Sequence, residues 1–535
     1  MGTAADLFVQ CLKAGGIDTV YALPGEETNA LMDALATAGM DVVLCRHEQA
    51  AAFMAAVHGR LTGHPAACLA TLGPGATNLV TGVADAMLDR VPLVAISGQA
   101  ARSRLHRDSD SHQVIDLARL FDPITKLSKT LASGAQIPET VAEAIRLARA
   151  PRPGAVHLSL PEDLAAEVLD GTPLPVPDPI LPHFNPTALS AALMHLTNAE
   201  RPIVLAGAGV LRHGATDALA DVLAETGLPL ATSFAAKGLL DANHPQHLGA
   251  FGLPTEDHVD RAIASADLIL AVGYDPVEYP VSALTDGTTP VVALSEASLP
   301  LDVGWPLAAS VEGDLVASLS TMVRGLEARR WTIWDTAKDA RRSLHADLAQ
   351  ARAAADQTPP TAQSLATAVS DGILPDDTTI CGVGTHKLAM ARNFMPKRPG
   401  QIVIANGLAG MGLAVPGAIA AARLQPAGRS IAICGDGEVM MNVQEFETAT
   451  RLNLALMVVV WIDGAFGLIE DKQEAETGTR PDLSFATMDW AALARAFGWI
   501  HRPCDTAADL RDALHAFDGG RHLVTVPVSY AGDLA

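Results

Sequence analysis

Short apolar runs alternate with longer amphipathic segments along most of the chain. The runs are rich in Val, Ile, Leu and Ala, as in buried strands, and the segments between them carry apolar residues at helical spacing. This alternation is typical of parallel α/β sheets. Predicted strands lie at 19–23, 41–45, 66–70, 92–97, 201–210, 267–273, 378–383, 401–405, 430–434, 456–462 and 522–528, and predicted helices at 28–38, 47–62, 77–89 and 442–453.

Two segments interrupt the alternation. Residues 168–186 contain six prolines and are predicted to be an extended linker, and residues 331–362 are polar and end in two prolines. At roughly 150 residues per domain, 535 residues allow about three domains. We therefore predict three Rossmann-like domains with parallel sheets, at 1–170, 187–330 and 360–535.

Composition and charge narrow the class of protein. The net charge of −23 argues against nucleic-acid binding, which needs clustered Lys and Arg. No apolar run is long enough for a membrane span, and the first residues resemble an amphipathic helix rather than a signal peptide. The six cysteines are dispersed and form no CxxC pair, so buried free thiols are expected. These features predict a soluble cytoplasmic protein.

The stretch ICGDGEVMMN, residues 433–442, follows an apolar strand. Gly435 and Gly437 permit a tight turn, and the predicted helix after them offers free N–H groups to a phosphate. Asp436 has the wrong charge for phosphate alone, but Mg²⁺ between the two resolves the conflict. Asp463 ends the next strand, on the same edge of the sheet. The residues alone leave two readings open, a metal–phosphate site or two ordinary turn aspartates.

The longer stretch GDGEVMMNVQEFETATRLNLALMVVVWIDGAFGLIE resembles the thiamine diphosphate motif. The resemblance implies that Asp436 and Asp463 bind Mg²⁺ through their side chains and Ala465 through its carbonyl group. The sequence departs from this motif at two positions: Ile462 stands in place of an Asn, and Glu438 stands where small residues are usual. Glu438 therefore either points away from the diphosphate or weakens the site. Further cofactor contacts are implied for Gly435, Gly437, Glu438, Phe466, Gly467 and Leu468.

The stretch VLCRHEQAAAFMAAVHGR and the following ATLGPGATNLVTGVADA resemble the pyrimidine-binding domain of the acetolactate synthase family. The resemblance implies that Glu48 is the acid that hydrogen-bonds the aminopyrimidine ring and promotes its reactive tautomer. Taken alone, Glu48 is equally an acid favoured by the dipole of a first helical turn. Cofactor contacts in this domain are implied for Pro24, Gly25, Thr71, Gly75 and Asn78.

Two glycine-rich segments of the last domain extend the resemblance. NGLAGMGLAVPGAIAA (406–421) is similar to the segment that bends the cofactor, which implies contacts from Gly407, Gly410 and Met411, with Met411 as an apolar wedge. GVGTHKLAM (382–390) is similar to the loop over the diphosphate. It implies contacts from Gly384, Thr385 and His386. Core packing of Met411 and a structural role for His386 are the alternatives.

The resemblance runs from about Ala5 to Pro527. It implies a carboligase that uses thiamine diphosphate and Mg²⁺, decarboxylates pyruvate and joins the hydroxyethyl unit to a second 2-keto acid. It also implies an obligate homodimer, expected as a dimer of dimers, because the pyrimidine domain of one subunit meets the diphosphate domain of another. Four residues match positions near the substrate, or equally lie on a solvated surface: Gln99, His112, Gln113 and Lys126.

Some details favour the catabolic branch, which needs no FAD. Lys472 stands where the biosynthetic enzyme has a tryptophan, and VGYDPVEYP (272–280) is similar to the catabolic synthases. The GxG in GAGVLRHGA (206–214) is a weak dinucleotide signal, so no flavin is expected.

The loop PGEET (24–28) carries Glu26 and Glu27 where the biosynthetic enzymes have small residues. Carboxylates there disfavour an anionic second substrate unless they turn outward or pair with a lysine. The alternatives are therefore a 2-keto-acid decarboxylase, or an aldehyde lyase or carboligase with another acceptor. A non-catalytic nucleotide-binding protein is a third possibility.

Overall fold

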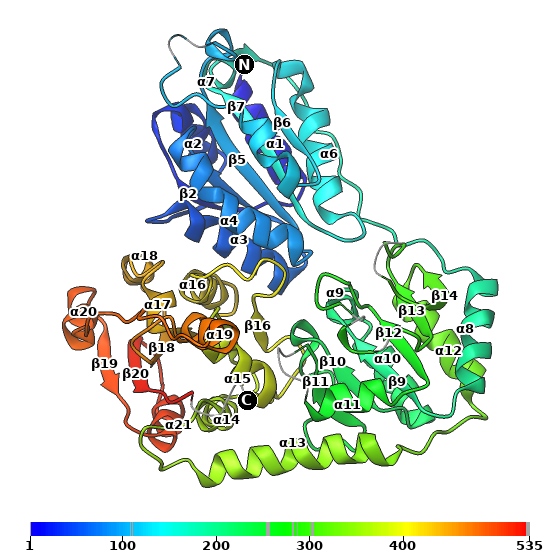
Figure 1. Ribbon diagram of the computed structural model, residues 1–535. Helices are drawn as coiled ribbons and strands as arrows, with labels where there is room; N and C mark the ends of the chain where they lie inside the picture. Colours follow the sequence, from blue (N-terminus) through cyan, green and yellow to red (C-terminus); the bar gives the residue numbers. More distant parts are fainter. Residues whose placement is uncertain are drawn as a thin grey trace. The chain divides into compact units, whose positions relative to one another are not determined.

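The computed structural model describes residues 2–107, 109, 111–252, 257–280, 283–285, 287–300 and 304–530. These residues form three six-stranded sheets and a two-stranded pair of β1 (Gly2–Thr3) and β8 (Val168–Leu169) (Figure 1). Every neighbouring pair of strands in the six-stranded sheets is parallel. The predicted α/β class with three parallel sheets is confirmed.

The first sheet has the strand order β3-β2-β4-β5-β7-β6. One face packs against α1 (Ala4–Ala14), α2 (Asn29–Thr37) and α6 (Ile137–Arg149), and the other against α3 (Glu48–Thr62) and α4 (Pro74–Leu88) (Figure 1). The strands β6 and β7 were not predicted from the sequence. The strands are β2 (Thr19–Leu23), β3 (Asp41–Leu44), β4 (Ala66–Ala70), β5 (Leu93–Gln99), β6 (Ser128–Thr130) and β7 (Ala155–Pro161).

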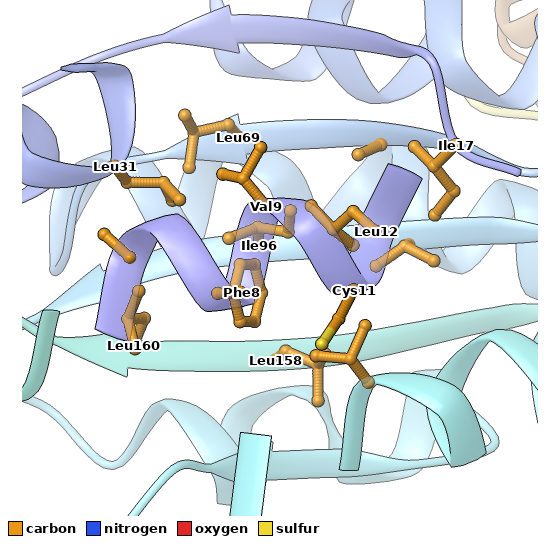
Figure 2. Packing of buried hydrophobic residues seen from close by; sticks show 14 of the residues in the cluster. Phe8, Val9, Cys11, Leu12, Ile17, Leu31, Leu69, Ile96, Leu158 and Leu160 are labelled. Atoms are coloured by element: carbon orange, nitrogen blue, oxygen red, sulfur yellow. The ribbon is translucent and has the colours of Figure 1, made fainter. Parts of the chain in front are cut away.

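The helix α1 shows how the sequence builds this layer. Thr3 and Asp6 cap its start reciprocally, since the Thr3 hydroxyl accepts the Asp6 N–H and the Asp6 carboxylate accepts the Thr3 N–H. Figure 2 shows its apolar side chains, Phe8 among them, directed at strand residues such as Leu69, Ile96 and Leu158. Phe8 is fully buried, and such burial contributes about 1.5–3 kcal/mol.

The central sheet has the order β11-β10-β9-β12-β13-β14. The predicted strand 201–210 is shorter in the structure, because the chain turns at Gly207 into α9. The strands are β9 (Pro202–Ala206), β10 (Leu230–Thr232), β11 (His247–Ala250), β12 (Leu268–Val272), β13 (Val291–Ser295) and β14 (Leu307–Glu312). The helices are α8 (Pro186–Asn198), α9 (Ala208–Arg212), α10 (Thr216–Thr226), α11 (His258–Ala264), α12 (Leu315–Leu326) and α13 (Asp335–Ala353).

The third sheet has the order β16-β15-β17-β18-β20-β19, the same topology as the first. Its strands are β15 (Thr378–Cys381), β16 (Ile402–Ile404), β17 (Ser430–Gly435), β18 (Leu456–Ile462), β19 (Ile500–Pro503) and β20 (Arg521–Pro527). The helices in this part of the sequence are α14 (Ala362–Gly372), α15 (Thr385–Asn393), α16 (Ala414–Leu424), α17 (Asp436–Val439), α18 (Glu445–Arg451), α19 (Gly467–Thr477), α20 (Trp490–Ala496) and α21 (Ala507–His515), of which α16 packs with α3 and with α18.

The predicted helix 442–453 is wrong in its extent. The chain forms the short helix α17 directly after Gly435 and the helix α18 only from Glu445. Around the start of α18, backbone N–H groups donate to carbonyl oxygens three residues earlier. The Glu445 N–H donates to the Asn442 carbonyl oxygen, and the Glu447 N–H to that of Gln444. These tight turns replace the first turn of the predicted α-helix.

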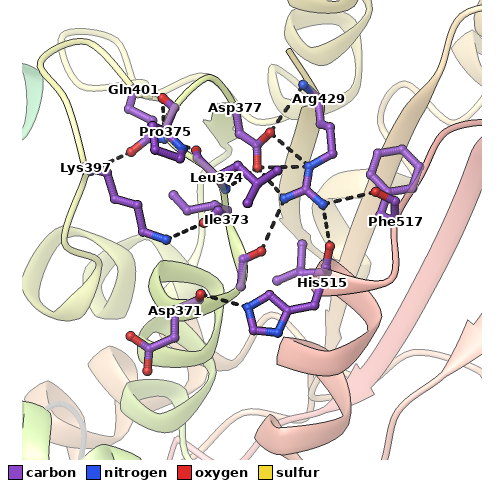
Figure 3. A network of polar contacts seen from close by, with 12 residues as sticks. Asp371, Ile373, Leu374, Pro375, Asp377, Lys397, Gln401, Arg429, His515 and Phe517 are labelled. Atoms are coloured by element: carbon purple, nitrogen blue, oxygen red, sulfur yellow. Dashed lines mark hydrogen bonds and ion pairs between the residues drawn. The ribbon is translucent and has the colours of Figure 1, made fainter. Parts of the chain in front are cut away.

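The amino ends of β15 and β17 are joined by a polar network (Figure 3). The Arg429 side chain contacts both carboxylate oxygens of Asp377, with Nε at 2.9 Å from Oδ1 and Nη2 at 2.5 Å from Oδ2. Its Nη1 donates to the carbonyl oxygens of Leu514 and Phe517, which ties the end of α21 to the sheet. This network fixes the end of the sheet that lies opposite Gly435.

By their contacts the residues form two compact units. The first contains Met1–Ile180, Gly407–Pro426 and Met440–Ala455, and the second contains Leu181–Asn406, Ala427–Val439 and Leu456–Ala535. All six cysteines are buried and free, as predicted. Within the described ranges no helix is both long and apolar enough to span a bilayer.

Candidate active site

Each parallel sheet has a point where the strand order reverses, and ligands of such sheets bind there, at the carboxyl ends of the strands. In the first sheet this point lies between β2 and β4, and in the third between β15 and β17. The loops at these two points carry most of the cofactor-binding residues predicted from the sequence. At the first, a Cβ atom on Gly25 would lie 2.6 Å from Thr71 Cβ, so only glycine allows this approach.

Asp436 joins the ends of β17 and β18. Its Oδ1 accepts the N–H of Gly437 and its Oδ2 that of Gly464, both at 2.9 Å. The side chain is buried, with 6% of the residue exposed. The two bonds fix the carboxylate at the edge where the sequence predicts the metal.

Asp463 lies next to Asp436. Partial burial of its carboxyl group and the neighbouring charge of Asp436 raise the pKa of Asp463 to about 7, although the residue as a whole keeps contact with solvent. Burial also raises the pKa of Asp436. Two interacting carboxylates of this kind are stabilised by a cation between them.

The donor set suits Mg²⁺ together with a phosphate ligand. Mg²⁺ takes one or two carboxylates and completes its shell with waters and phosphate oxygens. Among the described residues, no group of three or more His, Cys, Asp or Glu side chains is arranged around a metal position. A cation here therefore depends on other oxygens, such as the Ala465 carbonyl group and a diphosphate.

The segment after Asp463 is held close to the glycine turn. Gly464 accepts the N–H of Phe485 at 2.6 Å, and Phe466 packs edge-on against Phe485. A Cβ atom on Gly437 would lie 2.9 Å from Phe466. Gly467 lies against the Asp463 side chain, since a Cβ atom on Gly467 would be 2.6 Å from Asp463 Oδ2. Ala465 and Leu468 keep partial exposure in the same segment.

Gly384, Thr385 and His386 lie at the start of α15, opposite the turn after β17. His386 is buried, and its Nδ1 faces both glycine turns, within 2.9 Å of a Cβ built on Gly384 and 3.4 Å of one on Gly435. Its Nε2 lies 3.5 Å from Glu438 Oε2. Glu438 therefore points toward the start of α15 and the end of β15.

Glu48 begins α3 and is buried, with 7% of the residue exposed. Its Oε2 accepts a hydrogen bond from Asn78 Nδ2 at 2.9 Å. A Cβ on Gly75 would lie 3.3 Å from Glu48 Oε1, so glycine keeps space beside this oxygen. The structure thus brings Glu48, Gly75 and Asn78 together, near Thr71 and Gly25.

The loop that contains Met411 lies on α3 and α4 in the same unit. The Gly407 N–H donates to Asp89 Oδ1 at 2.6 Å, and a Cβ on Gly410 would lie 3.1 Å from Thr81 and 3.4 Å from Phe53. The side chain of Met411 is partly exposed. Phe53 belongs to the helix of Glu48, so the predicted wedge and the predicted acid share one neighbourhood.

Sequence reasoning missed Asn442, which connects these segments. Its buried amide donates to Gln49 Oε1 at 3.1 Å and to the Gly412 carbonyl oxygen at 2.9 Å. It thereby ties the first turn of α3 to the loop of Met411. The only sign of it in the sequence was an asparagine directly after the two methionines of MMN.

The predicted substrate residues are not all brought together. Gln99 is buried, and its Nε2 donates to the Ile115 carbonyl oxygen at 3.2 Å. His112 and Gln113 are exposed in a loop that crosses Gly73, at the start of α4. Gln99, His112 and Gln113 therefore lie at the carboxyl ends of the strands of the first sheet.

Lys126 lies elsewhere. It precedes β6, its N–H donates to the carbonyl oxygen of Ala155 at the start of β7, and its Nζ donates to the carbonyl oxygens of Ala150 and Arg152. It therefore lies at the amino ends of the parallel strands, opposite Gly25 and Thr71. The structure does not place it with the predicted substrate residues.

The two acids of the PGEET loop differ. Glu26 is exposed, as is Pro24, whereas Glu27 Oε2 accepts a hydrogen bond from Thr71 Oγ1 at 2.6 Å. Glu27 is therefore turned toward the strand end that also borders Gly75. A negative charge stays on this edge of the first sheet.

The strand order of the central sheet reverses between β9 and β12, and backbone of the chain itself packs closely at the carboxyl ends of these two strands. Cβ atoms on Gly207 and Gly209 would lie 2.6 Å and 2.7 Å from the Gly273 carbonyl oxygen. The Glu278 carboxylate accepts the Ala208 N–H at 3.1 Å and also a hydrogen bond from Ser233 Oγ. Burial raises the pKa of Glu278 to about 7 despite these bonds, which lower it. A carboxylate thus occupies the place where a dinucleotide phosphate binds in related folds.

Comparison with known proteins agrees with this arrangement. Residues 2–120 match the thiamine pyrophosphate enzyme N-terminal TPP binding domain, residues 189–291 the central domain, and residues 382–527 the C-terminal TPP binding domain. The class of protein is therefore that of the three-domain thiamine pyrophosphate enzymes.

Individual relatives narrow the class. The chain is 31% identical to an acetolactate synthase of Bacillus subtilis (strain 168), covering 99% of this chain and 94% of the relative. It is 29% identical to a catabolic acetolactate synthase of Raoultella terrigena, over 98% and 95% of the two chains. It is 31% identical to the acetolactate synthase isozyme 2 large subunit of Escherichia coli (strain K12), over 95% and 92%. The chain belongs to the acetolactate synthase family of thiamine pyrophosphate enzymes, which confirms the resemblance drawn from its motifs.

Proposed function

We propose that the protein decarboxylates pyruvate and joins the resulting two-carbon unit to a second 2-keto acid, with 2-acetolactate as the product from two pyruvates. The observation that carries this proposal is the pair of strand-end sites. A buried glutamate fixed by Asn78 lies in the N-terminal TPP binding domain, and Asp436 and Asp463 lie together in the C-terminal one.

The residues present fit the cofactor. Asp436, Asp463 and the carbonyl group of Ala465 would hold Mg²⁺, and the glycine turns at 384 and 435–437 would receive the diphosphate. Thiamine diphosphate, when bound, supplies a nucleophilic carbon and accepts the electron pair left by decarboxylation. The protein's own contribution is to bind, orient and move protons.

Glu48 is the residue that we assign to proton transfer. Asn78 engages Oε2, so the carboxyl group has one fixed rotamer and Oε1 beside Gly75 remains for the exchanged proton. A fixed, buried carboxyl group exchanges a proton with a bound ring more effectively than a mobile one. The Asn442 amide bonds both Gln49 and the Gly412 carbonyl oxygen, and so holds the helix of Glu48 against the loop of Met411.

Product analysis tests the proposal. The purified protein is incubated with pyruvate, Mg²⁺ and thiamine diphosphate, and CO₂ and acetolactate are measured. Release of CO₂ with acetolactate as the main product is expected. Absence of any carbon–carbon bond formation from pyruvate contradicts the proposal.

A second candidate function is supported by Glu27. Its hydrogen bond to Thr71 keeps a carboxylate near the pyrimidine half of the site, and such a charge disfavours a negatively charged acceptor. The two-carbon unit would then be joined to a neutral aldehyde, as in an aldehyde carboligase, or be protonated, as in a 2-keto-acid decarboxylase. A product screen over several keto acids and aldehydes separates the two functions. Dominant acetolactate would exclude the second.

We also propose that the enzyme needs no flavin. The support is Glu278, whose carboxylate takes the Ala208 N–H at the reversal point of the central sheet. A second negative group is disfavoured beside it. The same feature counts against a non-catalytic dinucleotide-binding protein. The purified protein should show no flavin absorbance, and added FAD should leave its turnover unchanged. Tight FAD binding would contradict this part.

The proposed assembly is an obligate homodimer, expected to pair into a dimer of dimers, in the cytoplasm. It rests on the family, in which pyrimidine and diphosphate domains from different subunits meet. The six buried free thiols agree with a reducing compartment. Light scattering on the purified protein should give the mass of a dimer or tetramer, and a monomer would contradict the proposal.

A further inference from the structure

Glu445, at the start of α18, holds the turn of chain that leads into the helix of Glu48. Its Oε1 accepts the N–H of Arg46 at 3.0 Å, and its Oε2 accepts the Thr448 hydroxyl at 2.6 Å. Glu445 and Thr448 are fully buried. Burial raises the pKa of Glu445, and the hydrogen bonds from Thr448 and from the backbone of Arg46 and His47 oppose this rise. The carboxylate is therefore fixed against the backbone directly before Glu48.

Neighbouring contacts hold the same turn from both sides. The Arg451 side chain, at the end of α18, donates to the Leu44 carbonyl oxygen. The Asn442 amide donates to Gln49 Oε1 at 3.1 Å, and the Gln49 N–H donates to His47 Nδ1 at 3.1 Å, which caps α3. The segment around α18 thus binds the chain on both sides of the residue to which we assign proton transfer.

The place of the Glu48 carboxyl group depends on two things. Asn78 fixes the end of the side chain, but the backbone from which the side chain extends must be fixed as well. A displacement of about 1 Å at a catalytic group can cost about 10²-fold in rate. A charged acceptor forms shorter and stronger hydrogen bonds to backbone N–H groups than a neutral one. Glu445 therefore suits the task of holding this backbone.

We propose that Glu445 is a positioning residue for Glu48, because its carboxylate fixes the backbone at Arg46 and with it the place from which Glu48 exchanges a proton. The inference rests on the proposed function. Loss of Glu445 should slow proton transfer. It should leave the affinity for thiamine diphosphate unchanged, since Asp436 and Asp463 are proposed to hold the metal.

Exchange of the proton on the reactive carbon of bound thiamine diphosphate tests the inference without substrate. The loaded protein is transferred into D₂O and quenched, and NMR measures the exchange rate. Glu445→Gln keeps the volume but loses one acceptor oxygen, and Glu445→Ala loses both. Both should lower the rate, by about ten- to a hundredfold in Glu445→Ala. Glu447→Gln is the matched control, a partly exposed acid of the same helix that lies 4.0 Å from the Arg46 side chain, and it should leave the rate unchanged.

Three further measurements separate positioning from general damage. In a Glu48→Gln background, Glu445→Gln should lower the exchange rate no further, because the residue that it positions has already lost its function. In the cofactor-free protein, amide hydrogen exchange of the peptide that contains Arg46 should be faster in the Glu445 variants than in Glu447→Gln. Calorimetric titration should give the same affinity for thiamine diphosphate in all of these single variants.

An unchanged exchange rate in the folded Glu445 variants overturns the inference, and so does an additive loss in the double variant. If the Glu445 variants fail to fold, Thr448→Val decides, because it removes only the hydroxyl that holds Oε2. It should also slow the exchange, and an unchanged rate overturns the inference. The proposed function stands in each case as long as the natural protein exchanges this proton faster than the free cofactor does. If the natural protein does not, the proposed function fails and the inference fails with it.

Discussion

The side-chain amide of Asn78 donates a hydrogen bond to Glu48 Oε2 at 2.9 Å. Asn78 belongs to the first part of α4 and Glu48 to the start of α3, so the bond crosses between the two helices that cover one face of the first sheet. The bond gives a buried carboxyl group a single orientation at the edge where the first sheet reverses its strand order. The proton-transfer role assigned to Glu48 depends on this arrangement.

Replacement of Glu48 tests that role. Glu48→Gln keeps the shape and the bond to Asn78 but cannot exchange a proton, so turnover should fall by about 10²–10⁴-fold. The affinity for thiamine diphosphate should change little, because the residues proposed to bind the metal and the diphosphate lie in another domain. Steady-state rates and calorimetric titration measure the two effects. Glu139→Gln, at an exposed acid of α6, is the control, and turnover equal to it would refute the role.

The proposed assembly of each site from two chains gives a second prediction. Glu48→Gln and Asp436→Asn homodimers should both be inactive. A heterodimer purified with two different tags contains one site with both natural residues if each site combines two chains. It should regain up to about half of the natural activity. An inactive heterodimer would instead assign Glu48 and Asp436 of one chain to the same site.

The ion pair of Arg429 and Asp377 predicts a stability effect far from the chemistry (Figure 3). Asp377 is 1% exposed, so removal of its partner leaves a buried charge uncompensated. Arg429→Met should destabilise the protein by about 3–5 kcal/mol. Scanning calorimetry measures the shift in unfolding temperature. The double variant with Asp377→Asn should lose less than the sum of the two single variants. Additive losses would show that the two side chains do not act together.

His157 predicts a dependence of stability on pH. It is fully buried, its Nε2 and Nδ1 lie 2.9 Å from Ser97 Oγ and Ser128 Oγ, and its ring stacks on Phe121. Burial lowers the pKa of His157 from 6.5 to about 3. Below pH 6.5 His157 is therefore protonated in the unfolded chain but stays neutral in the folded chain. The free energy of unfolding consequently falls as the pH is lowered from 6.5 toward 3.

Between pH 7 and pH 5, His157 should lower the free energy of unfolding by about 2 kcal/mol. Calorimetry over this pH range measures it as a falling unfolding temperature. His157→Gln should unfold at a lower temperature at pH 7 but show a shallower decrease toward pH 5. An equally steep decrease in the variant would show that other groups cause it.

Most of the fold could be predicted because the strands at the centre of each sheet are continuous apolar runs. The strand β18 (Leu456–Ile462) matches its prediction residue for residue. The strand β7 was missed because His157 and Ser159 interrupt its apolar pattern, and β6 because it is short and polar. Without these strands the sequence could not show that Lys126 lies at their amino ends.

The candidate site was predictable where glycine-rich turns directly follow apolar runs, as at Gly25 and Gly435. It was not predictable where a contact joins segments far apart in the chain. The bond from Asn442 to Gln49 and that from Ala208 to Glu278 are of this kind. The sequence also left two directions open for Glu438, and only the packing on Gly382 decided between them.

The central claim is that Asp436 and Asp463 hold thiamine diphosphate through Mg²⁺. Calorimetric titration of the cofactor-free protein, with Mg²⁺ and with EDTA, measures this directly. The natural protein and the exposed control Asp505→Asn should bind the cofactor only with Mg²⁺, whereas Asp436→Asn and Asp463→Asn should lose most of this binding. Binding that is equally tight in EDTA, or unchanged in both variants, would contradict the account.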